Sequence, residues 1–176
     1  ENISNVSQAI LILLLIGAVG GAWMVSGIVP TMIYYGMQVI NPYWFLVSSC
    51  LICAVVSVMT GSSWTTIATI GIALLGIGKA LGFHEGWIAG AIISGAYFGD
   101  KISPMSETTV LASSTTGTPL FVHIKYMMYT TIPAFLIGLL IFMVAGWNMA
   151  DAESVNVSLY AEGLSNAFTL SPWLMI

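Results

Sequence analysis

The chain has 176 residues, of which 58% are hydrophobic and only 6% are charged, and its mean hydropathy is +0.97. A soluble domain carries about 25% charged residues, so this chain cannot build a water-facing surface and we expect an all-α polytopic membrane protein. The net charge of −4 comes with no basic patch, which excludes nucleic acid as a partner.

The first apolar stretch, residues 9–40, is too long for one straight membrane helix. As a single helix it would extend roughly 48 Å, whereas the hydrocarbon core of a bilayer is about 30 Å thick. A glycine and a proline within Ser26–Pro30 favour a break there. The next helix is expected to begin near Pro42 and to end near Met59.

Two later apolar runs, residues 67–78 and 87–99, are too short to span a bilayer alone. Each would give only about 18–20 Å of helix. The first follows the hydroxyl-rich stretch Thr60–Thr66, and the second leads into the polar stretch Asp100–Thr116. Either the polar neighbours are drawn into the membrane or these helices stop midway. Interrupted apolar segments of this kind are a pointer to a transporter binding site.

Small residues recur at helical spacing within residues 86–99. Ala91, Gly95 and Gly99 fall on one face, and a second face carries Gly86, Gly90 and Ser94. Because small residues let membrane helices approach closely, we expect this helix to be packed on both faces.

The rest of the chain holds one long helix and one short helix. The long helix is expected over Pro119–Gly146, with a kink at Pro133. After it, residues 147–171 are polar and acidic, with a short amphipathic helix near Ser158–Phe168. The two cysteines, Cys50 and Cys53, lack the further nearby ligands that zinc needs, so we interpret them as small buried side chains.

Three formal charges stand close together at Asp100, Lys101 and Glu107. A charged side chain at the bilayer centre costs at least about 2.5–3.5 kcal/mol. The stretch is therefore either an ordinary surface loop or part of a wet, protein-lined cavity. The dense hydroxyls around it favour the cavity, because irregular backbone at membrane depth is tolerated only where protein or water surrounds it.

Several of these motifs together resemble the NhaC-type Na⁺/H⁺ antiporters, over roughly Trp23–Gly146. The motifs are Gly61–Thr66 followed by Ile70–Lys79, then Gly95–Thr109, and Gly117-Thr118 with His123–Lys125. The resemblance implies an ion-transporter superfamily fold of two inverted repeats, each with a re-entrant hairpin and a broken helix. Residues 1–176 would form a single transmembrane region of about one repeat. Since the chain does not begin with Met, we expect a fragment of a longer protein.

The resemblance implies exchange of Na⁺ for H⁺ by alternating access, and we hypothesise that Asp100 carries the exchanged ion. Sodium needs the deprotonated carboxylate, so its entry expels a proton. Glu107 would be either a second proton carrier or a structural partner of Lys101. The oxygen ligands would come from Ser103, Ser106, Thr108 and Thr109, with Ser62, Ser63, Thr65 and Thr66 on the opposite wall.

The main alternative is exchange of small carboxylates of the malate and lactate type, coupled to H⁺ and Na⁺. Members of the family often have Asp where this chain has Glu107, and Asn where it has Val110, and both differences bear on selectivity. An intramembrane aspartyl protease is disfavoured, because Tyr97–Asp100 lacks the first glycine of the G-x-G-D motif. We therefore expect no enzyme and no cofactor.

The expected location is the cytoplasmic membrane of a prokaryote, crossed several times. The expected partners are Na⁺, H⁺ and the lipid bilayer, and the resemblance also allows a homodimer.

Overall fold

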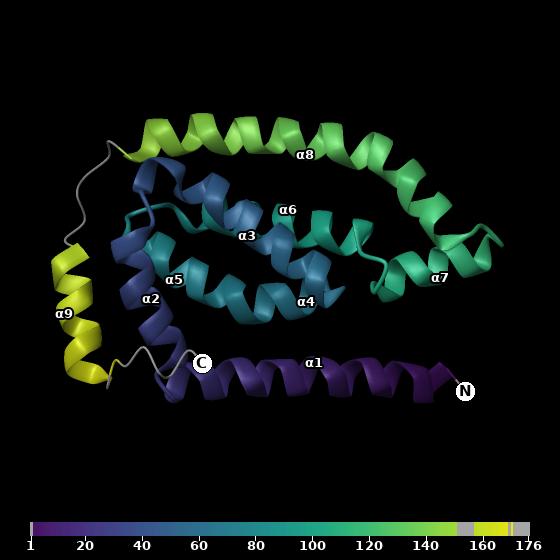
Figure 1. Ribbon diagram of the computed structural model, residues 1–176. Coiled ribbons are helices and arrows are strands. Elements are labelled where there is room, and N and C mark those ends of the chain that lie inside the picture. The colour runs from purple at the N-terminus through teal and green to yellow at the C-terminus, as the bar shows by residue number, and fades with distance from the viewer. Residues whose placement is uncertain (1, 151–156, 169, 171–176) are drawn as a thin grey trace.

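The computed structural model describes residues 2–150, 157–168 and 170, and all regular structure within them is helical. Residues 151–156 of the predicted acidic segment 147–171 lie outside the described residues, as do residue 169 and the chain end at 171–176. The elements are α1 (Asn2–Val25), α2 (Ile28–Val39), the 3₁₀ turn η1 (Pro42–Trp44), α3 (Phe45–Thr60), α4 (Ser63–Thr66), the π-helical η2 (Ile67–Gly71), α5 (Ile72–Ala80), α6 (Glu85–Ile102), α7 (Glu107–Thr115), α8 (Leu120–Ala150) and α9 (Val157–Ala167) (Figure 1).

The predicted break in the first apolar stretch is confirmed. The two sides of the break are bent by 69°, and Figure 1 shows α2 running across the direction of α1. The bend occurs at Gly27, whose φ of 84° lies in the left-handed region that favours glycine. Pro30 stands in the first turn of α2, where a missing backbone donor costs little. The glycine therefore makes the break, and the proline only follows it.

The next two apolar segments form a hairpin that turns at Gly61. One arm is η1 with α3, and the other is the continuous helix α4–η2–α5. The first arm begins as predicted at Pro42, where the Asn41 side chain accepts the amide of Tyr43 at 3.0 Å. The hydroxyl-rich stretch Thr60–Thr66 is helical except for the turn at Gly61 and Ser62, and with Ser63–Thr66 the second arm reaches 18 residues.

A second interruption separates α6 from α7. The α6 helix extends past its apolar run to include Asp100 and Lys101, and α7 begins after a short non-helical segment, Ser103–Ser106. The hairpin turn lies against this segment, because a Cβ on Gly61 would come within 2.7 Å of the Met105 carbonyl carbon. The two chain interruptions therefore meet at one place.

The hairpin is shorter than α8, the helix beside it. Its root is level with the end of α8, since the rings of Trp44 and Trp147 lie 6.0 Å apart. From that level α3 rises about 24 Å to Thr60, while α8 extends about 40 Å to Leu120. Each arm is long and apolar enough to cross a membrane on its own. The re-entrant hairpin that the resemblance implies therefore stays a prediction.

One face of α6 packs directly onto α3. A Cβ on Gly95 would overlap the carbonyl oxygen of Cys50, and one on Gly99 would overlap that of Ala54. In the same contact, Ser57 Oγ donates a 2.6 Å hydrogen bond to the Ala96 carbonyl. We call this contact the α3–α6 seam. It confirms the small-residue packing predicted for the Ala91, Gly95 and Gly99 face.

The second predicted packing face of α6 is not formed within the described residues. Gly86 and Ser94 are exposed, and Gly90 is only half-buried. Where α6 packs against α8, the contact is made by aromatic rings instead. Phe98 stacks on Phe135, with 3.8 Å between the ring centroids. Aromatic side chains hold two helices further apart, so small residues are not needed on that side.

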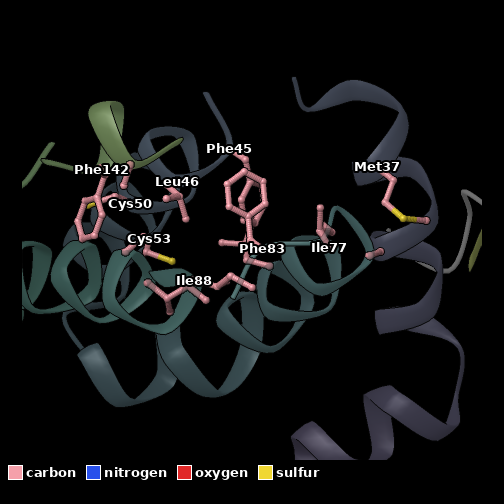
Figure 2. Packing of buried hydrophobic residues seen from close by; sticks show 14 residues of the cluster. Met37, Phe45, Leu46, Cys50, Cys53, Ile77, Phe83, Ile88 and Phe142 are labelled. Carbon is pink, nitrogen blue, oxygen red and sulfur yellow. The ribbon is translucent and has the colours of Figure 1, made fainter. Parts of the chain in front are cut away.

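The apolar core lies beside the seam, near the root of the hairpin. Figure 2 shows Phe45, Leu46 and Ile88 at its centre, with Phe142 reaching in from α8 (Figure 2). Cys50 and Cys53 are buried free thiols in this cluster, which confirms their interpretation as packing residues.

The last two helices also lie where the sequence predicted them, but the kink expected at Pro133 does not interrupt α8. The α8 helix is a single 31-residue helix that contains Pro133, and it stays arched and continuous in Figure 1. Most of its apolar side chains are exposed. The α9 helix occupies the predicted amphipathic segment and lies beside α2.

Replacing Gly95 by alanine should destabilise the protein, because its Cβ would meet backbone that cannot move aside. We expect the free energy of unfolding to fall by about 1–3 kcal/mol, as in other overpacked cores. The measurement is thermal unfolding of the purified full-length protein in detergent. Gly90→Ala is the matched control in the same helix, since its Cβ would make only an ordinary contact, 3.8 Å from Phe142. Equal stability of the two variants would contradict the seam.

Candidate functional site

Asp100 lies in the last turn of α6, with only 8% of its surface exposed. Its two carboxylate oxygens are held by hydroxyls from two different chain interruptions. Ser106 Oγ donates to Oδ1 at 2.7 Å, and Ser63 Oγ donates to Oδ2 at 3.2 Å. The surface-loop interpretation is therefore wrong for Asp100, whereas the wet cavity around it stays a prediction.

On the hairpin side, only one of the four predicted oxygen ligands reaches Asp100. Ser63 makes that contact from a position that is 2% exposed. Ser62 instead caps α4, with its Oγ accepting from the amide and the hydroxyl of Thr65 at 3.3 and 3.1 Å. Thr66 Oγ1 donates to the Ser62 carbonyl at 2.9 Å. Ser62, Thr65 and Thr66 thus shape the turn that presents Ser63.

On the α6–α7 side, the hydroxyls divide in the same way. Ser103 Oγ donates to the Val58 carbonyl at 2.8 Å, which ties this segment to the hairpin. Thr109 Oγ1 donates to the carbonyl of Lys101 at 3.2 Å, with a longer contact of 3.4 Å to that of Asp100. Thr108 Oγ1 lies 2.9 Å from Ser106 Oγ. Ser106 contacts the carboxylate directly, whereas Thr108 is connected to the carboxylate only through Ser106.

Two positioning residues were missed from the sequence, Gly61 and Ser57. Gly61 has φ of 70° and sits directly against the main chain of Met105, so it sets how closely the hairpin approaches Asp100. A left-handed glycine often ends a helix, and the glycine before Ser62-Ser63 was the available signal. The Ser57 hydrogen bond across the seam has no signal in the sequence, because it depends on the α6 backbone.

Glu107 and Lys101 are both exposed and do not pair with each other. Among the described residues the ion pair is Lys79 with Glu85, at 2.7 Å on the turn between α5 and α6. There the hydrogen bond from Lys79 lowers the pKa of Glu85. The suggested structural role of Glu107 as a partner of Lys101 is thus not supported, and its role as a second proton carrier stays a prediction.

The groups around Asp100 are hard oxygen ligands. One carboxylate, several hydroxyls and the backbone carbonyls at the helix breaks are ligands that suit a small hard cation. Within the part of the chain that the structure describes, no three His, Cys, Asp or Glu side chains cluster to hold a metal ion. A hydroxyl that donates to Asp100 can also rotate and offer its lone pairs, so the same groups can satisfy either an anion or a cation.

A sequence model of the Na⁺/H⁺ antiporter family matches residues 3–116 and 95–176. The chain belongs to this family. It is 46% identical over 93% of its length to the Na(+)/H(+) antiporter NhaC of Alkalihalophilus pseudofirmus, and 44% identical over its whole length to NhaC of Bacillus subtilis. It is also 44% identical over its whole length to the Malate-2H(+)/Na(+)-lactate antiporter of Bacillus subtilis.

The chain spans only part of the length of these curated relatives. It covers 36% and 39% of the two NhaC proteins and 38% of the malate and lactate antiporter. No solved structure matches it significantly. The relatives are transporters and not enzymes, in agreement with the sequence prediction. The described residues supply three helices that are long and apolar enough to cross a membrane, or four with the bent pair, as expected of a multi-pass protein of the cell membrane.

Replacing Gly61 by alanine should disturb the site more than the same change at Gly117. Both glycines have left-handed φ, of 70° and 65°, so each alanine costs about 1–2 kcal/mol of backbone strain. At Gly61 the new Cβ would also lie 2.7 Å from the main-chain carbonyl carbon of Met105. At Gly117 no atom lies within 4 Å of the new Cβ. We expect similar melting temperatures, or a lower one for Gly61→Ala, and a clear loss of transport in that variant alone. Equal transport would refute the positioning role.

Proposed function

We propose that the full-length protein exchanges Na⁺ for H⁺ and that Asp100 binds the two ions in turn. The observation that carries the proposal is the burial of this carboxylate between Ser63 and Ser106, with no ion pair to a basic side chain of the described residues. A buried carboxylate that lacks a cationic partner is costly in its charged form. Either a proton or a metal cation can balance such a charge.

The depth of Asp100 supports a membrane-embedded site. Around the root of the hairpin lie Trp44, Trp87 of α6 and Trp147 of α8, together with the Lys79–Glu85 pair. Aromatic and charged residues of this kind mark a membrane interface. Asp100 follows Glu85 by about 22 Å of helix. In a hydrocarbon core about 30 Å thick, it would lie beyond the centre, where the hairpin turn covers it.

Exchange follows from the exclusivity of the carboxylate. When protonated, Asp100 is neutral and attracts no cation. When a sodium ion binds, the deprotonated form is required, so the proton must leave. Ser63 on the hairpin and the backbone carbonyls at the turn can join the sodium shell, while Ser106 stays on the other carboxylate oxygen.

We assign the exchange to Asp100 and not to Glu107, because their surroundings differ. Asp100 is enclosed by hydroxyls, whereas the Glu107 side chain is exposed at the start of α7. A carboxylate in contact with water has no need of a sodium ion to balance its charge. A homodimer and a second, inverted repeat in the remainder of the protein stay predictions.

A carboxylate exchanger is the second candidate, favoured by the 44% identity to the malate and lactate antiporter over the whole chain. In that case Asp100 would bind the coupling ions and the solute would bind elsewhere. Proteoliposomes of the full-length protein should then take up labelled malate in exchange for internal lactate. If instead ²²Na⁺ moves against a proton gradient with neither acid present, the simple cation exchanger is correct.

Replacing Asp100 by asparagine should abolish Na⁺-dependent proton movement, because an amide has no proton to exchange in the working pH range and no negative charge to balance a bound cation. The measurement is pH-dye fluorescence in proteoliposomes after addition of Na⁺. The matched control is Glu85→Gln, the same chemical change at the exposed end of α6, which should keep nearly full activity. Glu107→Gln tests the competing carboxylate and should also remain active.

Activity retained in Asp100→Asn would rule out this aspartate as the carrier. If Glu107→Gln is inactive while Asp100→Asn transports, the roles of the two carboxylates must be exchanged.

A further inference from the structure

The hydroxyls around Asp100 include one continuous chain that reaches the exposed face of α7. Ser106 is fully buried and donates to Asp100 Oδ1 at 2.7 Å. Its oxygen lies 2.9 Å from the hydroxyl of Thr108, and either of the two can be the donor. Thr108 itself is exposed. Two hydrogen bonds therefore connect the buried carboxylate to the outer face of the described structure.

The other hydroxyls of α7 cannot extend such a chain, because each donates its proton to backbone. Ser113 and Ser114 donate to the carbonyls of Val110 and Leu111 at 2.8 and 2.9 Å, and Thr115 and Thr116 also donate one turn back. These are ordinary helix bonds of Ser and Thr. Thr108 is the hydroxyl of this helix that pairs with another hydroxyl.

No such hydroxyl chain leads away from the opposite side of Asp100 in the described structure. Ser63 donates to Oδ2 at 3.2 Å and is itself 2% exposed, and no second hydroxyl continues from it in the described structure. The neighbouring Ser62 and Thr65 bond to each other instead. The two carboxylate oxygens thus have different surroundings, one at the end of a hydroxyl chain and one facing the hairpin.

We propose that Thr108 and Ser106 form a proton wire that serves Oδ1 of Asp100, while the cation is bound from the Oδ2 side by the hairpin. This inference rests on the proposed Na⁺/H⁺ exchange and goes beyond it, because it assigns the two ions different routes to one carboxylate.

The transfer conserves protons at each link. A hydronium ion gives a proton to Thr108 Oγ1 and leaves as water, Thr108 passes its own hydroxyl proton to Ser106 Oγ, and Ser106 passes its proton to Asp100 Oδ1. One proton enters, the carboxylate becomes neutral, and each hydroxyl keeps one proton. Release of the proton runs the same links in reverse. Both hydroxyls must rotate between cycles, which Ser and Thr side chains can do.

The test separates proton movement from cation movement in the full-length protein. Replacing Thr108 by valine removes the hydroxyl and keeps the shape of the side chain. We expect Na⁺-driven proton movement to slow by about tenfold or more, since positioned proton transfer is typically worth at least that much. Exchange of ²²Na⁺ for unlabelled Na⁺ at high pH, which moves no net proton, should be unchanged.

Two further variants complete the design. Thr108→Ser keeps the hydroxyl and should restore proton movement, which separates loss of the wire from loss of folding. Ser114→Ala removes an exposed hydroxyl of the same helix that bonds only to backbone, and it should transport like the wild type.

Three outcomes would overturn the wire. Equal slowing of Na⁺/H⁺ and Na⁺/Na⁺ exchange in Thr108→Val would make Thr108 part of the cation site or of the fold. Unchanged Na⁺/H⁺ exchange would mean that the proton takes another route. Absence of Na⁺-driven proton movement in the wild type would instead remove the proposed function on which the wire rests, and that failure is visible before any variant is made.

Discussion

The site depends on a buried carboxylate that forms no ion pair with a basic side chain in the part of the chain that the structure describes. A charge removed from water must be compensated by nearby polar groups, and for Asp100 these come from the turn of the hairpin and from the break between α6 and α7. Neither interruption could do this alone, because each supplies one hydroxyl to one oxygen. The two interruptions must therefore lie at the same height, and the rest of the structure serves that requirement.

The α3–α6 seam provides the alignment. Glycines at positions 95 and 99 bring the two helix backbones into contact, and the Ser57 and Ser103 hydroxyls each donate across to the other element. Toward the hairpin root the same contact becomes apolar, around Phe45 and Ile88. The α3–α6 pair is therefore packed by apolar side chains at one end and carries the polar site at the other.

The amino-acid pattern predicted the elements well because glycine, proline and apolar length are local properties. It predicted the break at Gly27, the start at Pro42, the buried cysteines and the family. Which hydroxyls face Asp100 could not be predicted, because this depends on where a helix begins. Ser62 and Ser63 are neighbours of the same type, yet Ser62 caps the helix and Ser63 meets the carboxylate.

Other expectations failed for reasons of tertiary structure. Gly86, Gly90 and Ser94 form a stripe as regular as Ala91, Gly95 and Gly99, but the sequence does not say whether a neighbouring helix brings small side chains or rings. Lys101 and Glu107 are close in sequence, but a helix break lies between them, so they do not share one helical face.

The π-helical turn η2 has a geometric consequence for the hairpin arm that contains it. In an unbroken α-helix, Ser63 and Leu74 would lie on nearly the same side, since eleven residues make about three full turns. The wide turn between them adds one residue to the cycle and rotates the later part of the arm by about 100°. Ser63 can then point at α6 while Ile77 packs against Gly36 of α2. The polar tip of the arm and the apolar side chain of Ile77 therefore point in different directions about the helix axis.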